Sequence, residues 1–312
     1  MLVNNRELPM LSLKNEKTKN FLHLHFLVFI AGFTAILGEL ISIKAIPLVW
    51  FRMSIALVFI IAYTLLTKTK IKVTPKTVIK FFGAGVIIAL HWITFFGAID
   101  ASNISITLAM FSTGAFFASI IEPIIYKRGV IWYEIIFGIL VVVGVFIITQ
   151  SEIKYLTGII LGISSAFLSS LFAVLNGKFL QSHSATVITF YEFISGVLFV
   201  TIFIAIFGQG FDIEFFNLPS SDYGYLFILA SICTAYAFIA SVYVMKHISP
   251  YSVVLAYNLE PIYGMLLALF LFPEKENMGS NFYYGAIIIL FSVFLNGILK
   301  NKGKFKKALQ KK

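Results

Sequence analysis

The chain has 312 residues, of which 59% are hydrophobic and 12% are charged, and its mean hydropathy is +0.94. Soluble domains have about 45–50% apolar and about 25% charged residues, so the composition excludes a soluble globular protein and indicates an integral membrane protein. The formal net charge of +10 would suggest nucleic-acid binding in a soluble chain. Here the basic residues lie between apolar runs, so we interpret them as topology signals and expect no nucleic-acid partner.

Ten apolar segments have the length of roughly 20 residues that a helix needs to cross a lipid bilayer. The runs are too long and too continuously apolar for the strands of a membrane barrel, so we predict an all-α protein with ten transmembrane helices. The first run exceeds the apolar core of a signal peptide and lacks a small-residue cleavage site, so we expect it to remain as a span. The predicted spans are residues 22–42, 46–66, 77–98, 102–126, 131–150, 155–176, 185–208, 223–244, 250–273 and 281–299.

Basic residues in and beside the connecting segments gather on one side of the membrane. If the N-terminus is cytoplasmic, the opposite side holds only Lys44, Lys154 and Lys275. Cytoplasmic loops carry an excess of Lys and Arg, so we predict that the N-terminal segment 1–20 and the basic tail 300–312 are both cytoplasmic. We expect the tail to contact lipid head groups and the multi-pass chain to lie in the inner (cytoplasmic) membrane of a bacterium.

An offset of 147 residues aligns two stretches of the chain without a gap. Leu108-Ala109 then falls on Leu255-Ala256, and the order of spans and short loops also matches. The offset contains five spans, an odd number, so the second copy must enter the membrane in the opposite sense. Inverted repeats of this kind are typical of secondary transporters with a central substrate site. We therefore predict two five-helix units, the first unit at 21–150 and the second unit at 151–299.

Three stretches carry a recognisable pattern. Residues 249–274 (SPYSVVLAYNLEPIYGMLLALFLFPE) place Glu260-Pro261 within an apolar run and are followed by Gly285 early in the next run. Residues 47–58 (PLVWFRMSIALV) have Pro at the entry of a span and Arg inside it, and residues 91–112 join two further spans. Together these stretches resemble the repeats of the EamA family in the drug/metabolite transporter superfamily.

The resemblance implies two inverted units of five helices, a substrate path between them, and alternating access without ATP. It also implies export or exchange of small metabolites, amino acids or drugs. The first unit departs from the pattern, because Thr113-Gly114 stands where Glu260-Pro261 stands in the second. Any role of a Glu-Pro pair within the membrane therefore applies only to Glu260 and Pro261.

We therefore expect a secondary transporter that exports or exchanges a small organic metabolite such as an amino acid, with proton coupling as an open question. A lipid or glycolipid flippase of the same superfamily is the alternative, and a lateral apolar opening between helices would favour it. The sequence contains no HExxH, GxSxG or Walker A motif and no pair of intramembrane Asp residues. We accordingly expect no enzymatic activity, cofactor or metal.

Glu260 is the first candidate for the transport path, because ionisable groups inside a span are costly and are functional candidates. It lies about ten residues into its predicted span, or roughly 15 Å along a helix and close to the bilayer midplane. Glu260 either binds a substrate amine or a coupling proton, or satisfies backbone groups that Pro261 loosens by removing a donor and bending the helix. The neighbouring Tyr257 shares its face, and Asn258 is either a substrate ligand or a bond between helices.

Arg52 and Glu192 occupy nearly matching positions of the two units, at mirrored depths. Arg52 either clamps a substrate carboxylate, or pairs with Glu39 near the outer end of the first span, or snorkels to the membrane interface. Glu192 forms a polar patch with Tyr191 and Ser195. We expect this patch to face the central path, because no nearby span offers an obvious basic partner.

His91 and Trp92 lie in the outer half of the third predicted span. His91 either relays protons or binds substrate, or it is a neutral side chain bonded to a neighbouring helix. Gly158 and Gly162 begin a small-residue face with a four-residue period, which we expect to be structural and to permit close helix packing. The candidates for substrate binding or coupling are therefore Arg52, His91, Trp92, Tyr191, Glu192, Tyr257, Asn258 and Glu260.

Overall fold

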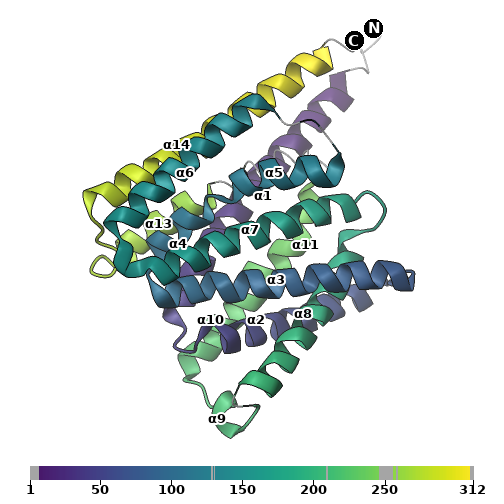
Figure 1. Ribbon diagram of the computed structural model, residues 1–312. Coiled ribbons are helices and arrows are strands. Elements are labelled where there is room, and N and C mark those ends of the chain that lie inside the picture. The colour runs from purple at the N-terminus through teal and green to yellow at the C-terminus, as the bar shows by residue number, and fades with distance from the viewer. Residues whose placement is uncertain are drawn as a thin grey trace.

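The structure, a computed structural model, describes residues 7–127, 129, 131–208, 210–245, 256–257 and 259–309 (Figure 1). Every regular element in these ranges is a helix, and they contain no strand. Nine helices within them are long and apolar enough to cross a membrane. These findings confirm the predicted all-α membrane fold.

The first half of the chain contains six helices that follow the first five predicted spans. Two of them begin at an N-cap side chain: Thr74 accepts a hydrogen bond from the Thr77 N–H, and Asn103 accepts one from the Ile106 N–H. The fourth predicted span is divided into two helices. The helices are α1 Glu7–Leu40, α2 Ala45–Leu66, α3 Pro75–Ala101, α4 Ile104–Phe111, α5 Gly114–Tyr126 and α6 Trp132–Ser151.

The second half begins with two long helices at the sixth and seventh predicted spans. The eighth predicted span is a composite of two α-helices with one π-helical turn between them. Polar segments connect the spans of this half, and one of these segments contains a short helix, Ile213–Phe216. The elements are η1 Ile153–Tyr155, α7 Leu156–Phe179, α8 Ala185–Phe207, α9 Ile213–Phe216, α10 Ser220–Ala230, η2 Ser231–Tyr236, α11 Ala237–Met245, α13 Glu260–Leu271 and α14 Ser280–Leu309.

The ninth predicted span, residues 250–273, is only partly described. Helix α13 has 12 residues, which is too short to cross a bilayer without the residues before it. Residues 250–255 and 258 of this predicted span lie outside the described ranges. The count of ten spans therefore stays a prediction, and so does the inverted relation of the two units.

Helices α4 and α5 are separated by a break at Ser112 and Thr113. The Ser112 hydroxyl donates to the Leu108 carbonyl at 2.8 Å. The Thr113 hydroxyl donates to the Met110 carbonyl at 2.6 Å. Hydroxyls that bond nearby carbonyls compete with the helical backbone, and the following Gly114 is a poor helix former. These three adjacent residues account for the interruption.

Helix α13 begins at Glu260, after the turn residue Leu259. Proline lacks an N–H group and suits the first turn of a helix, so Pro261 begins this helix and does not bend one in its middle. The offset of 147 residues places Thr113 on Glu260. Helix α5 begins at Gly114, so α5 and α13 begin within one residue of matching positions in the two predicted units.

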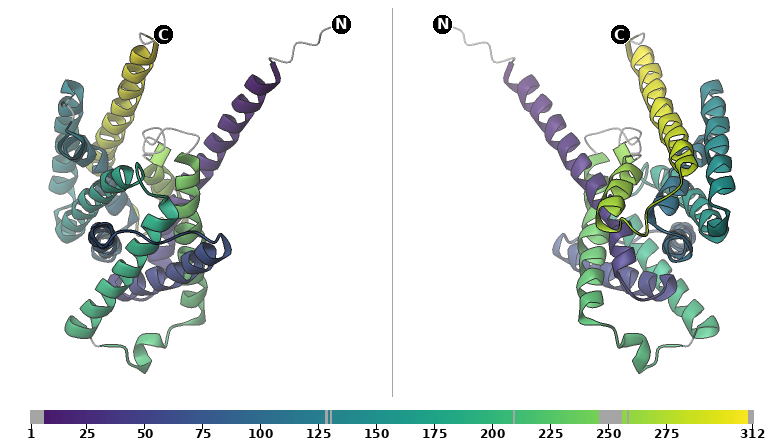
Figure 2. Two further views of the ribbon diagram at one scale, coloured as in Figure 1. Left: turned by 90° about the vertical axis from the view of Figure 1, so that its right-hand side faces the viewer. Right: turned by 90° about the vertical axis from the view of Figure 1, so that its left-hand side faces the viewer.

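The long helices of the two predicted units pack directly on one another (Figures 1 and 2). Helix α3 runs along both α7 and α8, α2 runs along α8, and α6 runs along α14. Close packing of this kind holds membrane helices together, because lipid offers them no hydrophobic driving force. The largest cluster of buried residues includes Leu48, Met53, Ile88, Phe193 and Ala235. The core therefore lies where α2 and α3 meet α8 and η2.

The outer faces of the bundle are apolar. Helix α6, for example, exposes Ile135, Ile139, Val142 and Phe146, as expected for a surface in contact with lipid. Figure 2 shows that the N-terminal end of α1 and the C-terminal end of α14 leave the bundle on the same side. The membrane face on which they lie stays a prediction.

Candidate functional site

Arg52 lies in the core of the bundle and is 2% exposed. Its Nε donates to the hydroxyl of Thr234 at 2.8 Å. Its Cζ atom lies 4.0 Å from the centroid of the Trp92 ring and 5.5 Å from that of Phe96. A guanidinium over an aromatic face is held by cation–π attraction. Arg52 therefore joins α2 and α3 of the first predicted unit to η2 of the second.

Thr234 reaches Arg52 because of the π-helical turn η2. Its hydroxyl donates to the carbonyl of Leu229, five residues earlier, at 2.7 Å, and this leaves its oxygen free to accept from Arg52. Single π-helical turns occur mostly at functional positions. Thr234 is not recognisable from the sequence, since a lone Thr in an apolar span is ordinary and the π turn has no local sequence signal.

The Arg52 guanidinium has no carboxylate partner within reach of an ion pair in the part of the chain that the structure describes. Its Nη1 atom is buried and makes no hydrogen bond there. Glu39, the predicted structural partner, instead binds Lys275. Glu260 interacts with Arg52 electrostatically from the start of α13. The site thus contains a buried cation whose hydrogen-bonding capacity is only partly used.

His91 and Trp92 follow each other on α3 and contact different neighbours. The Nδ1 atom of His91 lies 2.9 Å from the hydroxyl oxygen of Ser165 on α7 and 3.1 Å from the Ser165 carbonyl oxygen. The imidazole ring is stacked on Phe111, with centroids 5.5 Å apart. The Trp92 ring faces Arg52 and packs edge-on against Phe193. His91 therefore bonds a neighbouring helix, while Trp92 forms one wall of the Arg52 site.

The predicted polar patch on α8 separates into contacts with several elements. The Tyr191 hydroxyl donates to the carbonyl of Ile71, before α3, at 3.0 Å. The Ser195 hydroxyl donates to the Phe82 carbonyl on α3 at 2.7 Å. Glu192 is fully buried and contacts α7. These side chains attach α8 to its neighbours, and they do not converge on a single point.

The segment around Glu260 lies at the entrance of α13. Tyr257 shares a hydrogen bond of 2.6 Å with the hydroxyl of Ser241 on α11. Glu260 is partly buried and Pro261 is buried. Asn258 lies outside the described residues. The structure therefore brings Glu260, but not Tyr257, into interaction with Arg52.

Gly158 and Gly162 lie where α7 passes very close to the first predicted unit. A Cβ atom on Gly158 would collide with the Ser102 side chain. One on Gly162 would lie 2.8 Å from the Cβ atom of Met110, which is shorter than a normal contact. Small residues permit such close approach of helices in membranes, and at these two positions α7 has no room for a larger side chain.

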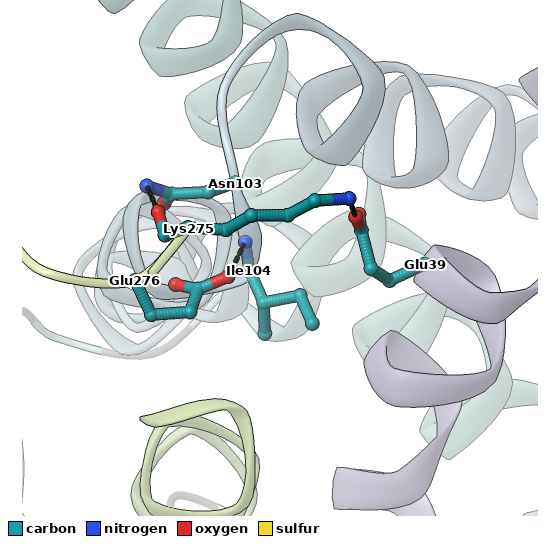
Figure 3. Close-up of polar contacts among 5 residues, drawn as sticks. All are labelled: Glu39, Asn103, Ile104, Lys275 and Glu276. Atoms are coloured by element: carbon teal, nitrogen blue, oxygen red, sulfur yellow. Dashed lines mark hydrogen bonds and ion pairs between the residues drawn. The ribbon is translucent and has the colours of Figure 1, made fainter. Parts of the chain in front are cut away.

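Glu276 attaches the loop after α13 to the start of α4 (Figure 3). Glu276 is buried, and its two carboxylate oxygens accept from the backbone N–H groups of Ile104 at 3.0 Å and Ser105 at 2.8 Å. The first N–H groups of a helix have no partner within the helix and favour a negative charge. Glu276 thus caps a helix that belongs to the other predicted unit.

Two further contacts in Figure 3 strengthen this attachment. The Asn103 amide donates to the Lys275 carbonyl at 3.2 Å, and the Lys275 ammonium lies 2.6 Å from Glu39 at the end of α1. The hydrogen bond and charge of Glu39 raise the pKa of Lys275 above its ordinary value. Lys275 is 66% exposed along its side chain, so water weakens this ion pair. The buried Glu276 contacts are the stronger part of the attachment.

The remaining described connections on this side are joined in the same way. Asp222 accepts from the backbone N–H of Ser42 at 3.1 Å and from its hydroxyl at 2.6 Å. Glu152 accepts from the Gly279 N–H at 3.4 Å. Acidic side chains therefore close the bundle on the side that the charge pattern predicts to be external. The Glu152 contact lies within the second predicted unit, whereas those of Asp222 and Glu276 join the two units, and we refer to these latter contacts as the external ties.

No group of three or more His, Cys, Asp or Glu side chains among the described residues could hold a metal ion. The comparisons with known proteins point to transport. Residues 156–298 match the family described as "EamA-like transporter family". No curated protein matches the chain.

Solved structures share the fold. In solved structures, 25 chains match, and one of these, titled "Crystal structure of protein", aligns with a TM-score of 0.62 at 12% sequence identity. The alignment covers 90% of this chain and 96% of that chain, which supports a common fold but says nothing of the substrate. Residues 156–298 thus match the EamA-like transporter family, which confirms the resemblance that the sequence motifs carry.

Proposed function

We propose that the protein is a secondary transporter that exports or exchanges a small organic metabolite, such as an amino acid, by alternating access. The observation that supports this best is the Arg52 site. A charged group buried at membrane depth is costly and marks a substrate or ion path. Arg52 contacts Trp92 and Thr234 from different predicted units and interacts with Glu260, so relative movement of the units would alter its surroundings directly.

The starts of α5 and α13 support the same proposal. Helix α5 begins after Thr113 and α13 begins at Glu260, and these two residues occupy matching positions of the two predicted units. In transporters with inverted repeats, interrupted helices form the central site, because their free backbone groups bind charged parts of substrates and coupling ions. Glu260 lies at the start of α13, and it interacts electrostatically with the buried cation Arg52.

The external ties support alternating access with this side closed. Glu276 and Lys275 hold the second predicted unit to α4 and α1 of the first. Asp222 holds the start of α10 to Ser42 after α1. A path between the units cannot open on this side while these contacts persist. The state described here is therefore one in which we expect substrate to enter or leave on the opposite side, where both termini are predicted to lie.

The experiment that tests this function is efflux from proteoliposomes loaded with a labelled mixture of amino acids and other metabolites. We expect the wild type to release at least one compound and Arg52→Met to lose most of that release. Glu274→Gln, a change at an exposed loop carboxylate, serves as the control and should transport normally. The proposal fails if Arg52→Met is as active as the wild type.

A second arm of the same experiment separates the flippase alternative. The vesicles also contain fluorescent phospholipids, whose movement between leaflets is followed with a membrane-impermeant quencher. Release of a water-soluble compound without lipid movement supports the metabolite transporter. Lipid movement without release of any water-soluble compound would favour the flippase.

A further inference from the structure

Glu192, which is buried, and Asn176, which is partly buried, form a polar pair between α8 and α7. Glu192 is 0% exposed, and its Oε2 atom accepts from Asn176 Nδ2 at 3.3 Å. Its other oxygen, Oε1, is buried and has no hydrogen-bond partner among the described residues. The amide oxygen Oδ1 of Asn176 is likewise buried and has no hydrogen-bond partner among the described residues. Two buried acceptors therefore lack a donor within one pair of side chains.

The packing around Glu192 leaves little space for another group. A Cβ atom on Gly85 of α3 would collide with the Glu192 backbone. Two residues of α8 attach this region to its neighbours: the Ser195 hydroxyl donates to α3, and Gly196 adjoins Met53 of α2. The backbone at Glu192 is therefore tightly packed, and its side chain is closed to bulk water in this state.

The ionisable groups of the neighbouring elements are directed elsewhere. From α7, the Lys178 ammonium donates to the Ile125 carbonyl, and His183 beyond its end packs edge-on against Phe81. From α2, Arg52 bonds Thr234. From α3, Lys80 is exposed, and on α8 itself the Tyr191 hydroxyl donates to Ile71. Asn176 is the side chain that interacts with the Glu192 carboxyl group in the described part of the chain.

An ionised carboxylate would be unstable in these surroundings, because burial removes its water and Asn176 returns only one neutral hydrogen bond. A neutral carboxylic acid fits them. With a proton on Oε1, the acid donates to Asn176 Oδ1 while Oε2 continues to accept from Nδ2. One proton then supplies both missing donors, in the paired arrangement that an acid and an amide form readily.

We propose that Glu192 and Asn176 form a proton-binding site, occupied in the state with the external ties closed. The proton is held on Glu192 Oε1 and shared with Asn176 Oδ1. It leaves to water as the contact between α7 and α8 opens, which converts the acid to a carboxylate. A hard metal cation fits the pair less well, because such ions take about six oxygen ligands and the Asn176 NH₂ group faces the carboxyl group.

The position of Glu192 gives this site a place in the transport cycle. Glu192 is the eighth residue of α8, and Arg52 is the eighth residue of α2. The second predicted unit thus carries a group that gains and loses a proton where the first carries a permanent cation. This step rests on the proposed transport function: the bound proton is the coupling ion, and the Arg52 site binds the substrate.

Infrared spectroscopy of the purified, lipid-reconstituted protein tests the proton site without a substrate. The wild type at neutral pH should show the carbonyl stretch of a protonated carboxylic acid. Part of this band should disappear in Glu192→Gln and persist in the control Glu274→Gln, whose carboxylate is exposed. Asn176→Leu should shift that part of the band, because it removes the amide partner of the acid. The Asn176 variant keeps the test valid if Glu192→Gln does not fold.

The proton site is overturned if the wild type has no protonated-acid band at neutral pH, or if its band is the same in the variants of Glu192 and Asn176. The coupling step has a separate test. Transport by the wild type should depend on a pH gradient, and exchange by Glu192→Gln should be independent of it. An unchanged dependence in Glu192→Gln would overturn the coupling role, whereas a wild type that transports nothing refutes the proposed function and leaves the infrared result standing.

Discussion

The contacts of Arg52 depend on the shape of its side chain as well as on its charge. The guanidinium lies over the Trp92 ring, and its Nε donates to Thr234. A Lys ammonium has no planar face and no Nε donor in this position. The two contacts together hold the buried cation in place. The Nη1 atom, which makes no hydrogen bond among the described residues, is held with it.

We predict that Trp92→Leu lowers the thermal unfolding midpoint of the detergent-solubilised protein. The change removes a cation–π contact worth about 0.5–2 kcal/mol and leaves a cavity beside Arg52. Trp132→Leu on α6 is the matched control, because Trp132 is 71% exposed and points away from the bundle. Equal midpoints for the two variants would show that Trp92 does not support the buried guanidinium.

At the scale of single residues, some residues of the site can be recognised from the sequence and others cannot. Arg52 and Glu260 stand out, since charges are rare in apolar runs. Thr234 does not, because its role depends on a π-helical turn that moves its hydroxyl toward Arg52. Tyr191 and Ser195 were grouped by their spacing on one helix. The bonds that they make depend on which helices surround α8, and this is tertiary information.

At the scale of elements, the short helices depend on groups supplied from elsewhere in the chain. Helix α4 has 8 residues, and helices this short are marginal in isolation. Asn103 satisfies the Ile106 N–H, and Glu276 satisfies two more N–H groups at the same end. The loop that follows α13 thus completes the N-terminus of a helix far away in sequence.

We predict that Glu276→Gln favours opening of the bundle on the side of the external ties. Glutamine has the same shape, but its NH₂ group would face one of the two N–H groups, and losing a helix cap costs about 0.5–2 kcal/mol. One or two kcal/mol corresponds to roughly a 5- to 30-fold change in an equilibrium. Labelling of Ser105→Cys by an externally added thiol reagent should therefore accelerate by about that factor.

Two features make this labelling interpretable. The lone native cysteine, Cys233, is buried, and a Cys233→Ser background removes it. Glu274→Gln changes an exposed carboxylate in the same loop and should leave the labelling rate unaltered. If Glu276→Gln and Glu274→Gln label at the same rate, the Glu276 cap does not hold this side closed.

The sequence predicts the long helices well and the interruptions poorly. Apolar runs of about 20 residues are sufficient to place α2, α3 and α8. Residues 102–126 form one such run, yet Ser112, Thr113 and Gly114 break it. These three adjacent residues are a sequence signal for an interruption, but hydroxyl bonds to nearby carbonyls also occur in unbroken helices. The pattern alone therefore does not distinguish a bend from a break.

At the scale of the whole molecule, the polar contacts that join the two predicted units are unevenly distributed over the bundle. The core shared by α2, α3 and α8 is mostly apolar and aromatic, around the buried cation Arg52. The ties that the carboxylates of Asp222 and Glu276 form between the units lie at one end of the bundle. Apolar surfaces permit sliding, whereas each carboxylate tie is either made or broken. This division suits a molecule that moves between two discrete states.

The last prediction concerns this movement. Asp222 bonds both the backbone N–H and the hydroxyl of Ser42, so cysteines at the two positions are close enough for a disulfide or a short bifunctional linker. We predict that oxidation of Ser42→Cys/Asp222→Cys, in a Cys233→Ser background, abolishes transport and that a reducing agent restores it. The single variant Asp222→Cys controls for loss of the carboxylate and for oxidation itself.

The reason for this expectation is that alternating access needs each end of the path to open in turn. A covalent bond between the start of α10 and the segment after α1 would hold the external side in the closed arrangement seen here. A channel-like or lateral route would not require that side to open. Full transport by the crosslinked protein would therefore contradict alternating access through the external ties, while reversible inhibition would identify their opening as an obligatory step.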